Sequence, residues 1–278
     1  MNIKELTQQL INSGIEKNEA ETEMKLLLKY FCNYTIKDII LKNKLSQEQI
    51  DLLKTKVTER ILSKKPIQYI IGKSNFMGLD FIVNPTVLIP RDETELLVRK
   101  AVELINRYEF KTVIDVGTGS GCIACMVAKL TGCQVIGVDI SNDALGTALD
   151  NASNLKLNNR AIFRKSNVFS NVKPGESFDM IVSNPPYIPA SQKGNLQVEL
   201  SFEPETALYT DDIDGTIFYK KILDEAKNVL NRGGYILFEL GINQADIVCD
   251  YMITSGYKNI EILNDVAGIE RVACCQYV

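Results

Sequence analysis

The chain has 278 residues, enough for one large α/β domain and a small additional domain. Its hydrophobic fraction of 45% and its net charge of −4 are ordinary for a soluble globular protein, and no apolar run approaches the ~20 residues of a membrane helix. The seven cysteines, an odd number, favour reduced thiols, and histidine is absent. These features predict a cytoplasmic protein that has neither a membrane segment nor a metal centre.

Residues 1–71 are predicted to form a small helical domain. Apolar residues recur at helical spacing through three segments, and no strand pattern appears among them. Ser46 and Gln49 form a capping box at the start of the third helix, which Pro66 is expected to end.

Residues 72–90 have the pattern of a short hairpin that links two domains. Leu79, Phe81 and Val83 occupy alternate positions after Gly78, a residue that suits a tight turn. Two prolines keep the following stretch extended.

Residues 91–278 alternate between strand and helix patterns, which predicts a doubly wound, Rossmann-like α/β sheet that is mostly parallel. The last two strands are separated by a loop too short for a parallel crossover, so they are expected to form an antiparallel C-terminal hairpin. The predicted strands are 112–116, 134–139, 161–165, 178–183, 235–239, 260–263 and 271–278, and the predicted helices are 93–107, 122–130, 142–155, 216–230 and 244–255.

A glycine loop, Gly117-Thr118-Gly119-Ser120-Gly121, follows the first of these strands and opens a helix. The spacing departs from the Gly-x-Gly-x-x-Gly of dinucleotide sites, in which a pyrophosphate reaches the helix N-terminus. It resembles instead the S-adenosylmethionine loop of Rossmann-like methyltransferases. Asp139 ends the second strand, where a carboxylate can accept both ribose hydroxyl hydrogens, or else cap the helix that begins near Asn142.

The sequence Asn184-Pro185-Pro186-Tyr187 follows the fourth strand, at the sheet edge where ligands bind in such folds. The Asn184 side-chain oxygen and the Pro185 carbonyl can accept the two hydrogens of an NH2 group and turn its nitrogen toward a methyl donor. The prolines stiffen the loop, and Tyr187 can pack against a planar target. This pattern indicates methylation of a planar amide or amine nitrogen.

Further segments resemble the release factor glutamine methyltransferase family nearly end to end. They are Ile-Gln-Tyr-Ile-Ile-Gly (67–72), Phe-Met-Gly-Leu-Asp-Phe (76–81), Val-Leu-Ile-Pro-Arg-Asp-Glu-Thr-Glu (87–95), Phe-Glu-Pro-Glu-Thr-Ala-Leu (202–208) and Asn-Asp-Val-Ala-Gly-Ile-Glu-Arg (264–271). The resemblance implies S-adenosyl-L-methionine as cofactor. It also implies methylation of the glutamine in the Gly-Gly-Gln motif of class 1 peptide chain release factors, with residues 1–71 recognising the substrate protein.

Carried over residue by residue, the family pattern assigns two groups of site residues. Cofactor contacts are expected from Gly117, Thr118, Gly119, Ser120, Gly121, Asp139, Asn167 and Asn184. Substrate contacts are expected from Arg91 and from Asn184, Pro185, Pro186 and Tyr187, with Asn184, Pro185 and Tyr187 acting in catalysis.

Three positions depart from the family pattern. Asp92 replaces a usual proline, Val168 replaces a usual aromatic residue, and Asn167 replaces a usual acid that would accept from the adenine amino group. An asparagine oxygen can also accept this hydrogen bond, but without charge, and the sequence leaves open whether the cofactor binds more weakly.

Several alternatives remain open at this level. The Asn-Pro-Pro-Tyr loop also suits adenine-N6 methylation of DNA or RNA, although direct nucleic-acid binding is not expected from a chain of net negative charge. Methylation of a ribosomal-protein glutamine and a binding module without catalysis are further readings. Arg91 could instead pair with Glu95, and Cys122 and Cys125 have redox spacing.

Overall fold

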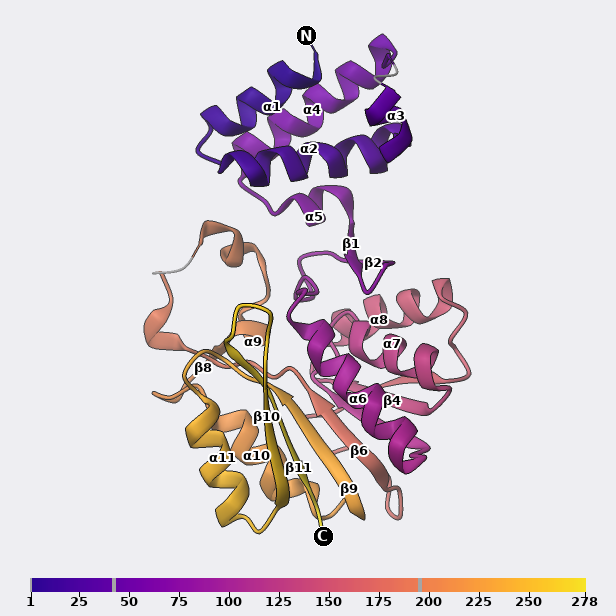
Figure 1. Cartoon of the computed structure of the whole chain (residues 1–278), viewed down its shortest axis with the longest axis vertical. Helices are drawn as coiled ribbons and strands as arrows, with labels where there is room; N and C mark the ends of the chain where they lie inside the picture. The colour runs from indigo at the N-terminus through magenta and orange to yellow at the C-terminus, as the bar shows by residue number, and fades with distance from the viewer. Residues whose placement is uncertain (1, 42–43, 195–196) are drawn as a thin grey trace. The chain divides into compact units, whose positions relative to one another are not determined.

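The computed structural model describes residues 2–41, 44–194 and 197–278 (Figure 1). The chain forms two compact units. One unit comprises Met1–Lys73 and Val198–Phe202, and the other comprises Ser74–Gln197 and Glu203–Val278.

The first unit is helical. Its helices are α1 (Ile3–Asn12), α2 (Lys17–Cys32), α3 (Ile36–Leu41), α4 (Gln47–Ser63) and α5 (Ile67–Ile71), and the short 3-10 helix η2 (Val198–Phe202) belongs to the same unit. The expected capping box of Ser46 and Gln49 is present at the start of α4. The prediction for Pro66 was wrong: α4 already ends at Ser63, because Lys64 turns into the left-handed region, and Pro66 precedes α5 instead.

A buried ion pair crosses this helical unit. The Arg60 side chain on α4 donates 2.9 Å hydrogen bonds to Glu23 on α2 and to Glu199 on η2. Arg60 and Glu23 are almost fully buried, so each charge depends on the other for compensation. The contact with Glu199 explains why η2 packs within this unit although it lies far along the chain.

Strands β1 (Lys73–Phe76) and β2 (Leu79–Ile82) form a two-stranded sheet. The two residues between them, Met77 and Gly78, both have positive φ, 50° and 80°, as the tight hairpin turn with right-handed twist requires. Phe76 and Phe81 are fully buried and meet edge to face.

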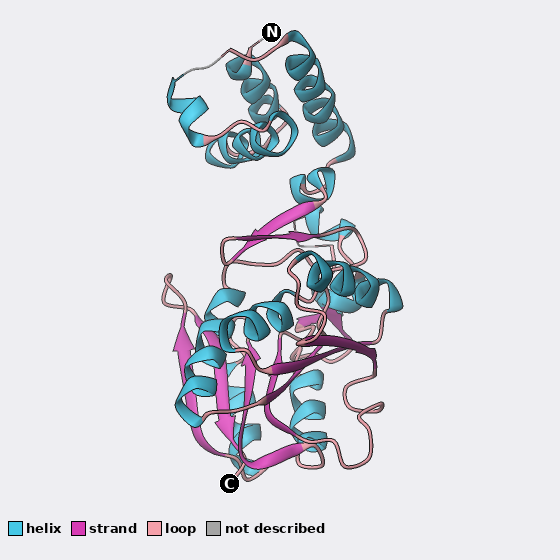
Figure 2. Ribbon diagram, turned by 90° about the vertical axis from the view of Figure 1, so that its right-hand side faces the viewer, coloured by secondary structure: helices cyan, strands magenta, loops and turns pink. Residues whose placement is uncertain are grey.

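The second unit is built on a seven-stranded sheet with the order β10-β11-β9-β6-β3-β4-β5. Figure 2 shows its strands in magenta, with helices in cyan around them. Its strands are β3 (Thr112–Val116), β4 (Gln134–Asp139), β5 (Ala161–Lys165), β6 (Phe178–Ser183), β9 (Leu230–Glu239), β10 (Lys258–Asn264) and β11 (Glu270–Gln276). The pairings from β9 through β5 are parallel, and β11 is antiparallel to both of its neighbours. The expected mostly parallel sheet with an antiparallel C-terminal hairpin is confirmed.

Helices cover both faces of this sheet. They are α6 (Thr94–Tyr108), α7 (Cys122–Thr131), α8 (Asn142–Asn154), α10 (Ile217–Ala226) and α11 (Ala245–Thr254). In Figure 1, α6 and α7 lie on one side of the sheet and α10 and α11 on the other. Successive strand residues point to opposite faces, so Val113 packs with the cluster under α6 and α7 while Ile114 packs with the cluster under α10 and α11. Both faces are apolar, which is why the strands read as continuous hydrophobic runs.

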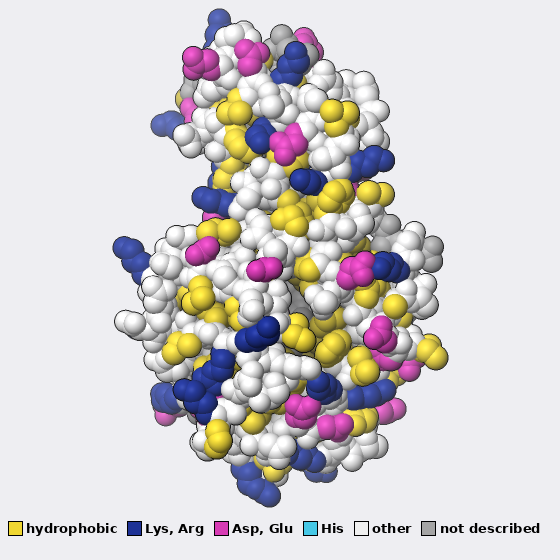
Figure 3. Space-filling view, turned by 180° about the vertical axis from the view of Figure 1, so that it is seen from behind, with side chains coloured by type: hydrophobic (Ala, Val, Ile, Leu, Met, Phe, Trp, Pro, Cys, Tyr) yellow, Lys and Arg dark blue, Asp and Glu magenta, His cyan; other side chains and the backbone are white. Residues whose placement is uncertain are grey.

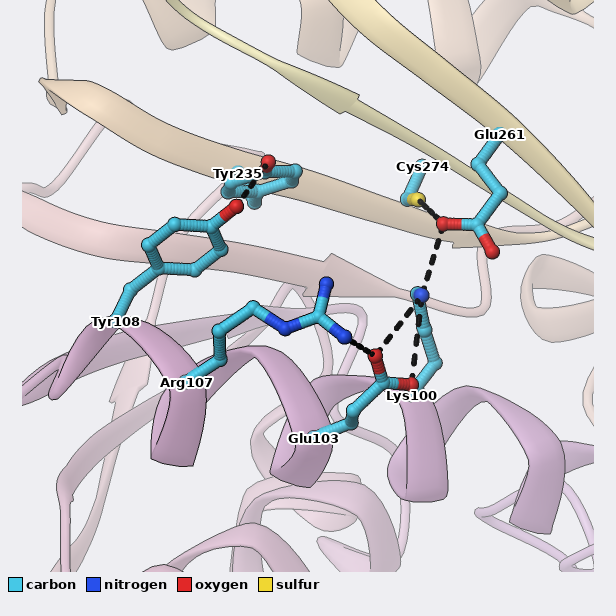
Figure 4. A network of polar contacts seen from close by, with 7 residues as sticks. All are labelled: Lys100, Glu103, Arg107, Tyr108, Tyr235, Glu261 and Cys274. Atoms are coloured by element: carbon cyan, nitrogen blue, oxygen red, sulfur yellow. Dashed lines mark hydrogen bonds and ion pairs between the residues drawn. The ribbon is translucent and has the colours of Figure 1, made fainter.

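Polar contacts link α6 to strands β10 and β9 (Figure 4). Lys100 is nearly buried, and its ammonium group lies 2.8 Å from Glu261 on β10 and 3.4 Å from Glu103 on α6. The hydroxyl groups of Tyr108 and Tyr235 are 3.1 Å apart. Because Lys100 has its positive charge compensated, its stem can remain packed against the sheet.

Further details differ from the sequence predictions. The helix expected over 216–230 ends at Ala226, and Leu230 already belongs to β9, where it pairs with Phe178. The chain after β6 also contains short elements with no periodic signal: β7 (Ile188–Pro189), η1 (Ala190–Gln192), α9 (Glu205–Leu208) and β8 (Tyr209–Thr210). Within the described residues, no helix is long and apolar enough to cross a membrane.

Candidate active site

A cavity of about 460 Å³ opens at the carboxyl ends of the parallel strands in the second unit. The predicted site residues that line it are Gly117, Gly119, Asp139, Asn167, Asn184, Pro185 and Pro186. Thr118, Ser120, Gly121, Tyr187 and Arg91 lie outside the lining, and their surroundings are described below. The ends of β3, β4 and β6 therefore bring three separate sequence motifs to one site.

The glycine loop owes its form to positive φ angles. Gly117, Gly119 and Gly121 have φ of 73°, 54° and 76°, which residues with a side chain rarely adopt. The N–H groups of Gly117 and Thr118 both donate to the Val138 carbonyl, so the loop is fastened to β4. A Cβ at Gly121 would lie 2.9 Å from the Cβ of Ala148, so this glycine allows α7 to pack against α8.

The polar residues of the loop are used internally. The Thr118 hydroxyl donates to Asp115 at 2.7 Å, and Ser120 is buried with its carbonyl accepting from Asn151. Burial raises the pKa of Asp115 to about 7, although the Thr118 hydroxyl and the Ala124 N–H oppose the shift. These buried residues stabilise the conformation of the glycine loop and do not face the cavity.

Asp139 joins the loop to the next segment of chain. Its Oδ2 accepts from Gly119 N at 2.9 Å and its Oδ1 accepts from Ser141 N at 2.9 Å. The helix-capping role considered for Asp139 belongs to Ser141, whose hydroxyl oxygen accepts from Ala144 N at the start of α8. The carboxylate remains on the cavity wall, where its further lone pairs can bind hydroxyl hydrogens.

Asn167 and Val168 line the next part of the cavity. The Asn167 side-chain oxygen accepts a 2.9 Å hydrogen bond from Lys221 Nζ, so part of its accepting capacity is already used. Val168 is buried with φ of 53°, a strained conformation for a β-branched residue. Sequence reasoning missed Lys221, since its approach depends on how α10 packs.

The loop from Asn184 to Tyr187 is held at both ends. Asn184 Nδ2 donates to Thr94 Oγ1 at 3.4 Å, and the Tyr187 carbonyl accepts from Gln244 Nε2 at 2.9 Å. Gln244 is itself buried and also accepts from Gly241 N. The Tyr187 ring packs against the hydrophobic cluster under α10 and α11, and burial raises the pKa of its hydroxyl.

Arg91 pairs with Glu203 rather than with Glu95. The Arg91 guanidinium donates to one oxygen of the buried Glu203 carboxylate, and the other oxygen accepts from Ile89 N at 3.0 Å. Glu95 bonds Arg99 and Met77 N instead. The Arg91–Glu203 pair therefore links the chain before α6 to the segment that precedes α9.

The cysteines argue against the redox alternative. Cys122 and Cys125 are buried, and burial raises the pKa of the Cys122 thiol to about 12. A redox-active thiol needs a lowered pKa, so this spacing serves packing at the start of α7.

The donor set suits a nucleoside with no phosphate. Gly117 and Gly119 leave open space where a Cβ would stand, Asp139 supplies a carboxylate for a ribose, and apolar residues such as Ile140 and Val168 can enclose an adenine. Later segments also contribute lining residues that were not among the predicted site residues: Pro204, Thr206, Ala207, Tyr209, Thr210, Asp211, Ile217, Phe218 and Ile222.

Comparisons with known proteins agree with this geometry. Residues 3–72 match the PrmC N-terminal domain family, and residues 109–267 match a methyltransferase domain family. A release factor glutamine methyltransferase of Flavobacterium psychrophilum is 34% identical over 95% of this chain and 94% of its own length. One of Geobacter sulfurreducens is 36% identical over 95% of this chain and 91% of its own length.

A solved methyltransferase from Pyrococcus furiosus has the same fold. It superposes with a TM-score of 0.53 at 20% identity, covering 84% of this chain and 99% of that one. The match to the methyltransferase domain family and the similar relatives confirm the expected S-adenosylmethionine-dependent methyltransferase class. With a glycine loop, Asp139 and Asn184 around one cavity and relatives matched over nearly their whole length, the chain belongs to the release factor glutamine methyltransferase family.

Proposed function

We propose that this chain methylates the side-chain amide nitrogen of the glutamine in the Gly-Gly-Gln motif of class 1 peptide chain release factors, with S-adenosyl-L-methionine as the methyl donor. The observation that carries the proposal is that Asn184 and Pro185 line the same cavity as the glycine loop and Asp139. The names of the relatives support the substrate class.

The chemistry fits the residues present. An amide nitrogen is a poor nucleophile, so it gains most from being oriented. The Asn184 side-chain oxygen and the Pro185 carbonyl can each accept one of its hydrogens. S-adenosylmethionine supplies an electrophilic methyl group on a positively charged sulfur. The methylated nitrogen then loses a proton to water, so no dedicated base is needed in a chain without histidine.

Each of the three regions predicted from the sequence is assigned a separate role in the reaction. We assign recognition of the release factor to residues 1–71, methyl transfer to residues 91–278, and a linking role to 72–90. The match of residues 3–72 to the PrmC N-terminal domain supports this assignment.

Adenine-N6 methylation of DNA or RNA is the main alternative, since its NH2 group has the same shape. On the face drawn in Figure 3, Lys and Arg side chains are interspersed with Asp and Glu rather than gathered into one basic patch. With a net charge of −4, the chain offers little attraction for a phosphate backbone. A ribosomal-protein glutamine is the other alternative substrate.

The test is incubation of the purified chain with isotopically labelled S-adenosylmethionine and candidate substrates. The substrates are a class 1 release factor, the same factor with the motif glutamine changed to alanine, a ribosomal protein, and DNA and RNA fragments. Label on the intact release factor alone, mapped by mass spectrometry to the motif glutamine, supports the proposal. Labelling of the altered factor, or only of another substrate, would contradict it.

A further inference from the structure

A buried hydroxyl and a buried carboxyl group lie directly behind the Asn184 side chain. Thr94 is the first residue of α6 and Glu239 the last of β9, and they are only 3% and 2% exposed. Thr94 Oγ1 lies 2.5 Å from Glu239 Oε2 and 3.4 Å from Asn184 Nδ2. Because Ser183 pairs with Phe238, Asn184 and Glu239 both follow the paired ends of neighbouring parallel strands.

The number of available hydrogens fixes the direction of these bonds. A threonine hydroxyl has one hydrogen, and an ionised carboxylate can only accept. With Glu239 ionised, Thr94 therefore donates to it and has only lone pairs to offer Asn184. Asn184 must in turn direct its NH2 group at Thr94, so its oxygen is the atom left free for a ligand in the cavity that Asn184 lines.

We propose that Thr94 and Glu239 are positioning residues that hold the Asn184 side-chain amide with its oxygen toward the substrate nitrogen. The inference rests on the proposed function, in which that oxygen accepts an N–H of the glutamine. A reversed amide would set its NH2 group against the NH2 group of the substrate, and neither would have an acceptor. An orientation fixed before the substrate arrives requires no rearrangement during the reaction.

The side chains of this pair hydrogen-bond each other and Asn184. The side chain of Glu93, at the N-cap position of α6, makes no capping hydrogen bond, and Thr94 directs its hydroxyl to Glu239 instead of to the helix backbone. A purely structural role would affect stability alone. A positioning role must affect the rate of methyl transfer while cofactor affinity stays the same.

The test compares Thr94→Val with Thr94→Ser in the full-length chain. Thr94→Val keeps the shape and removes the hydroxyl, so kcat for the release factor is expected to fall by about 10- to 100-fold. The Kd for S-adenosylmethionine, measured by calorimetry, should change by less than about twofold, since Asp139 and the glycine loop are untouched. Thr94→Ser keeps the hydroxyl and should recover most of the lost rate.

Thr112→Val is the matched control. Thr112 also donates to a carboxylate, Asp179, at 3.0 Å. However, it lies at the amino end of β3, whereas the cavity lies at the carboxyl ends of the parallel strands. Thr112→Val should lose stability without losing kcat. If Thr94→Val does not fold, Glu239→Gln carries the test, because its amide can donate to Thr94 and no longer dictates the direction of the bonds.

The outcomes separate the two proposals. A kcat of Thr94→Val within twofold of the unaltered chain, or a Thr94→Ser variant as slow as Thr94→Val, would overturn the positioning role. For Glu239→Gln, an unchanged kcat would do the same. If the unaltered chain fails to methylate the release factor glutamine, the proposed function is what fails.

Discussion

The backbone N–H of Gly119 donates a 2.9 Å hydrogen bond to Oδ2 of Asp139. A single carboxylate thus ties the loop after β3 to the end of β4. Each carboxylate oxygen has a second lone pair, so Asp139 can hold the loop and still accept ribose hydroxyls. The residue expected to bind the cofactor therefore also maintains the shape of the cofactor loop.

Asp139→Ala should weaken S-adenosylmethionine binding by ~1–3 kcal/mol, the cost of losing charged hydrogen bonds. Calorimetric titration measures the change directly. Asp143→Ala is the control, because Asp143 is an exposed acid on the first turn of α8 and is absent from the cavity lining. Equal affinity of Asp139→Ala and Asp143→Ala would contradict the role assigned to Asp139.

Asn184→Ala should bind the cofactor nearly as well as the unaltered chain but transfer the methyl group at least ~100-fold more slowly, because one oriented acceptor is lost. Single-turnover rates with the release factor, together with the Kd for the cofactor, separate the two effects. An exposed asparagine, Asn159, provides a control substitution to alanine. Turnover by Asn184→Ala that matches the control would remove Asn184 from the mechanism.

Gly121→Ala and Gly132→Ala form a matched pair for the close packing at the glycine loop. Both glycines have positive φ, 76° and 78°, so both substitutions carry a conformational cost of about 1 kcal/mol. Only at Gly121 would the new Cβ overlap a neighbour, Ala148, whereas at Gly132 the nearest atom is 3.8 Å away. Overpacking adds roughly 1–3 kcal/mol.

Denaturant unfolding should therefore find Gly121→Ala clearly less stable than Gly132→Ala. Equal losses would mean that α7 and α8 can move apart to admit the methyl group. In that case the packing of these helices would not explain why glycine stands at position 121.

Local sequence patterns predicted the strands and helices whose bounds are set by their own residues and by the turns beside them. The predicted bounds of β3 and β4 match the structure, because each is an apolar run bounded by turn residues. The helix predicted over 216–230 was too long, because Leu230 has a helical spacing yet pairs with Phe178 in the sheet. Pairing with a distant strand overrides a local pattern.

The candidate site follows the same division. Asp139 and Asn184 were proposed from sequence because Asp139 ends one predicted parallel strand and Asn184 directly follows another, and such ends converge at one edge. Thr94 and Glu239 are separated by 145 positions and meet only through the packing of α6 on β9. The sequence places an acid, Glu239, at the end of an apolar strand, but it does not indicate that Thr94 is the residue that bonds it.

Glu239 should also make the reaction depend on pH. Burial raises its pKa to about 7. Hydrogen bonds from Thr94 and Asn184 and the charge of Arg271 oppose the shift, and Glu93 adds to it. When protonated, Glu239 can donate to Thr94, which frees the Thr94 hydrogen for the Asn184 oxygen and allows the amide to reverse. The kcat of the unaltered chain is therefore expected to fall as the pH drops through about 7.

Three other titratable groups near Glu239 stay uncharged in this range. They are Tyr187, Tyr219 and Cys122, and burial raises the pKa of each above its ordinary value. Asp115 does have a pKa of about 7, but it is present in both the unaltered chain and Glu239→Gln. The kcat of the unaltered chain divided by that of Glu239→Gln, measured from pH 6 to 9, should therefore report the titration of Glu239 alone. This ratio should decrease toward low pH.

Stability should change in the opposite direction from activity. The pKa of Glu239 in the folded chain, about 7, lies above its ordinary 4.5, so the folded state binds this proton more tightly than the unfolded chain does. The resulting stabilisation is fully present below pH 4.5 and is lost as the pH rises through about 7. Glu239→Gln has no charge to bury, so at pH 8 it should be ~1–3 kcal/mol more stable than the unaltered chain while transferring methyl groups more slowly. A Glu239→Gln variant less stable than the unaltered chain at pH 8 would contradict the cost assigned to burying the Glu239 charge.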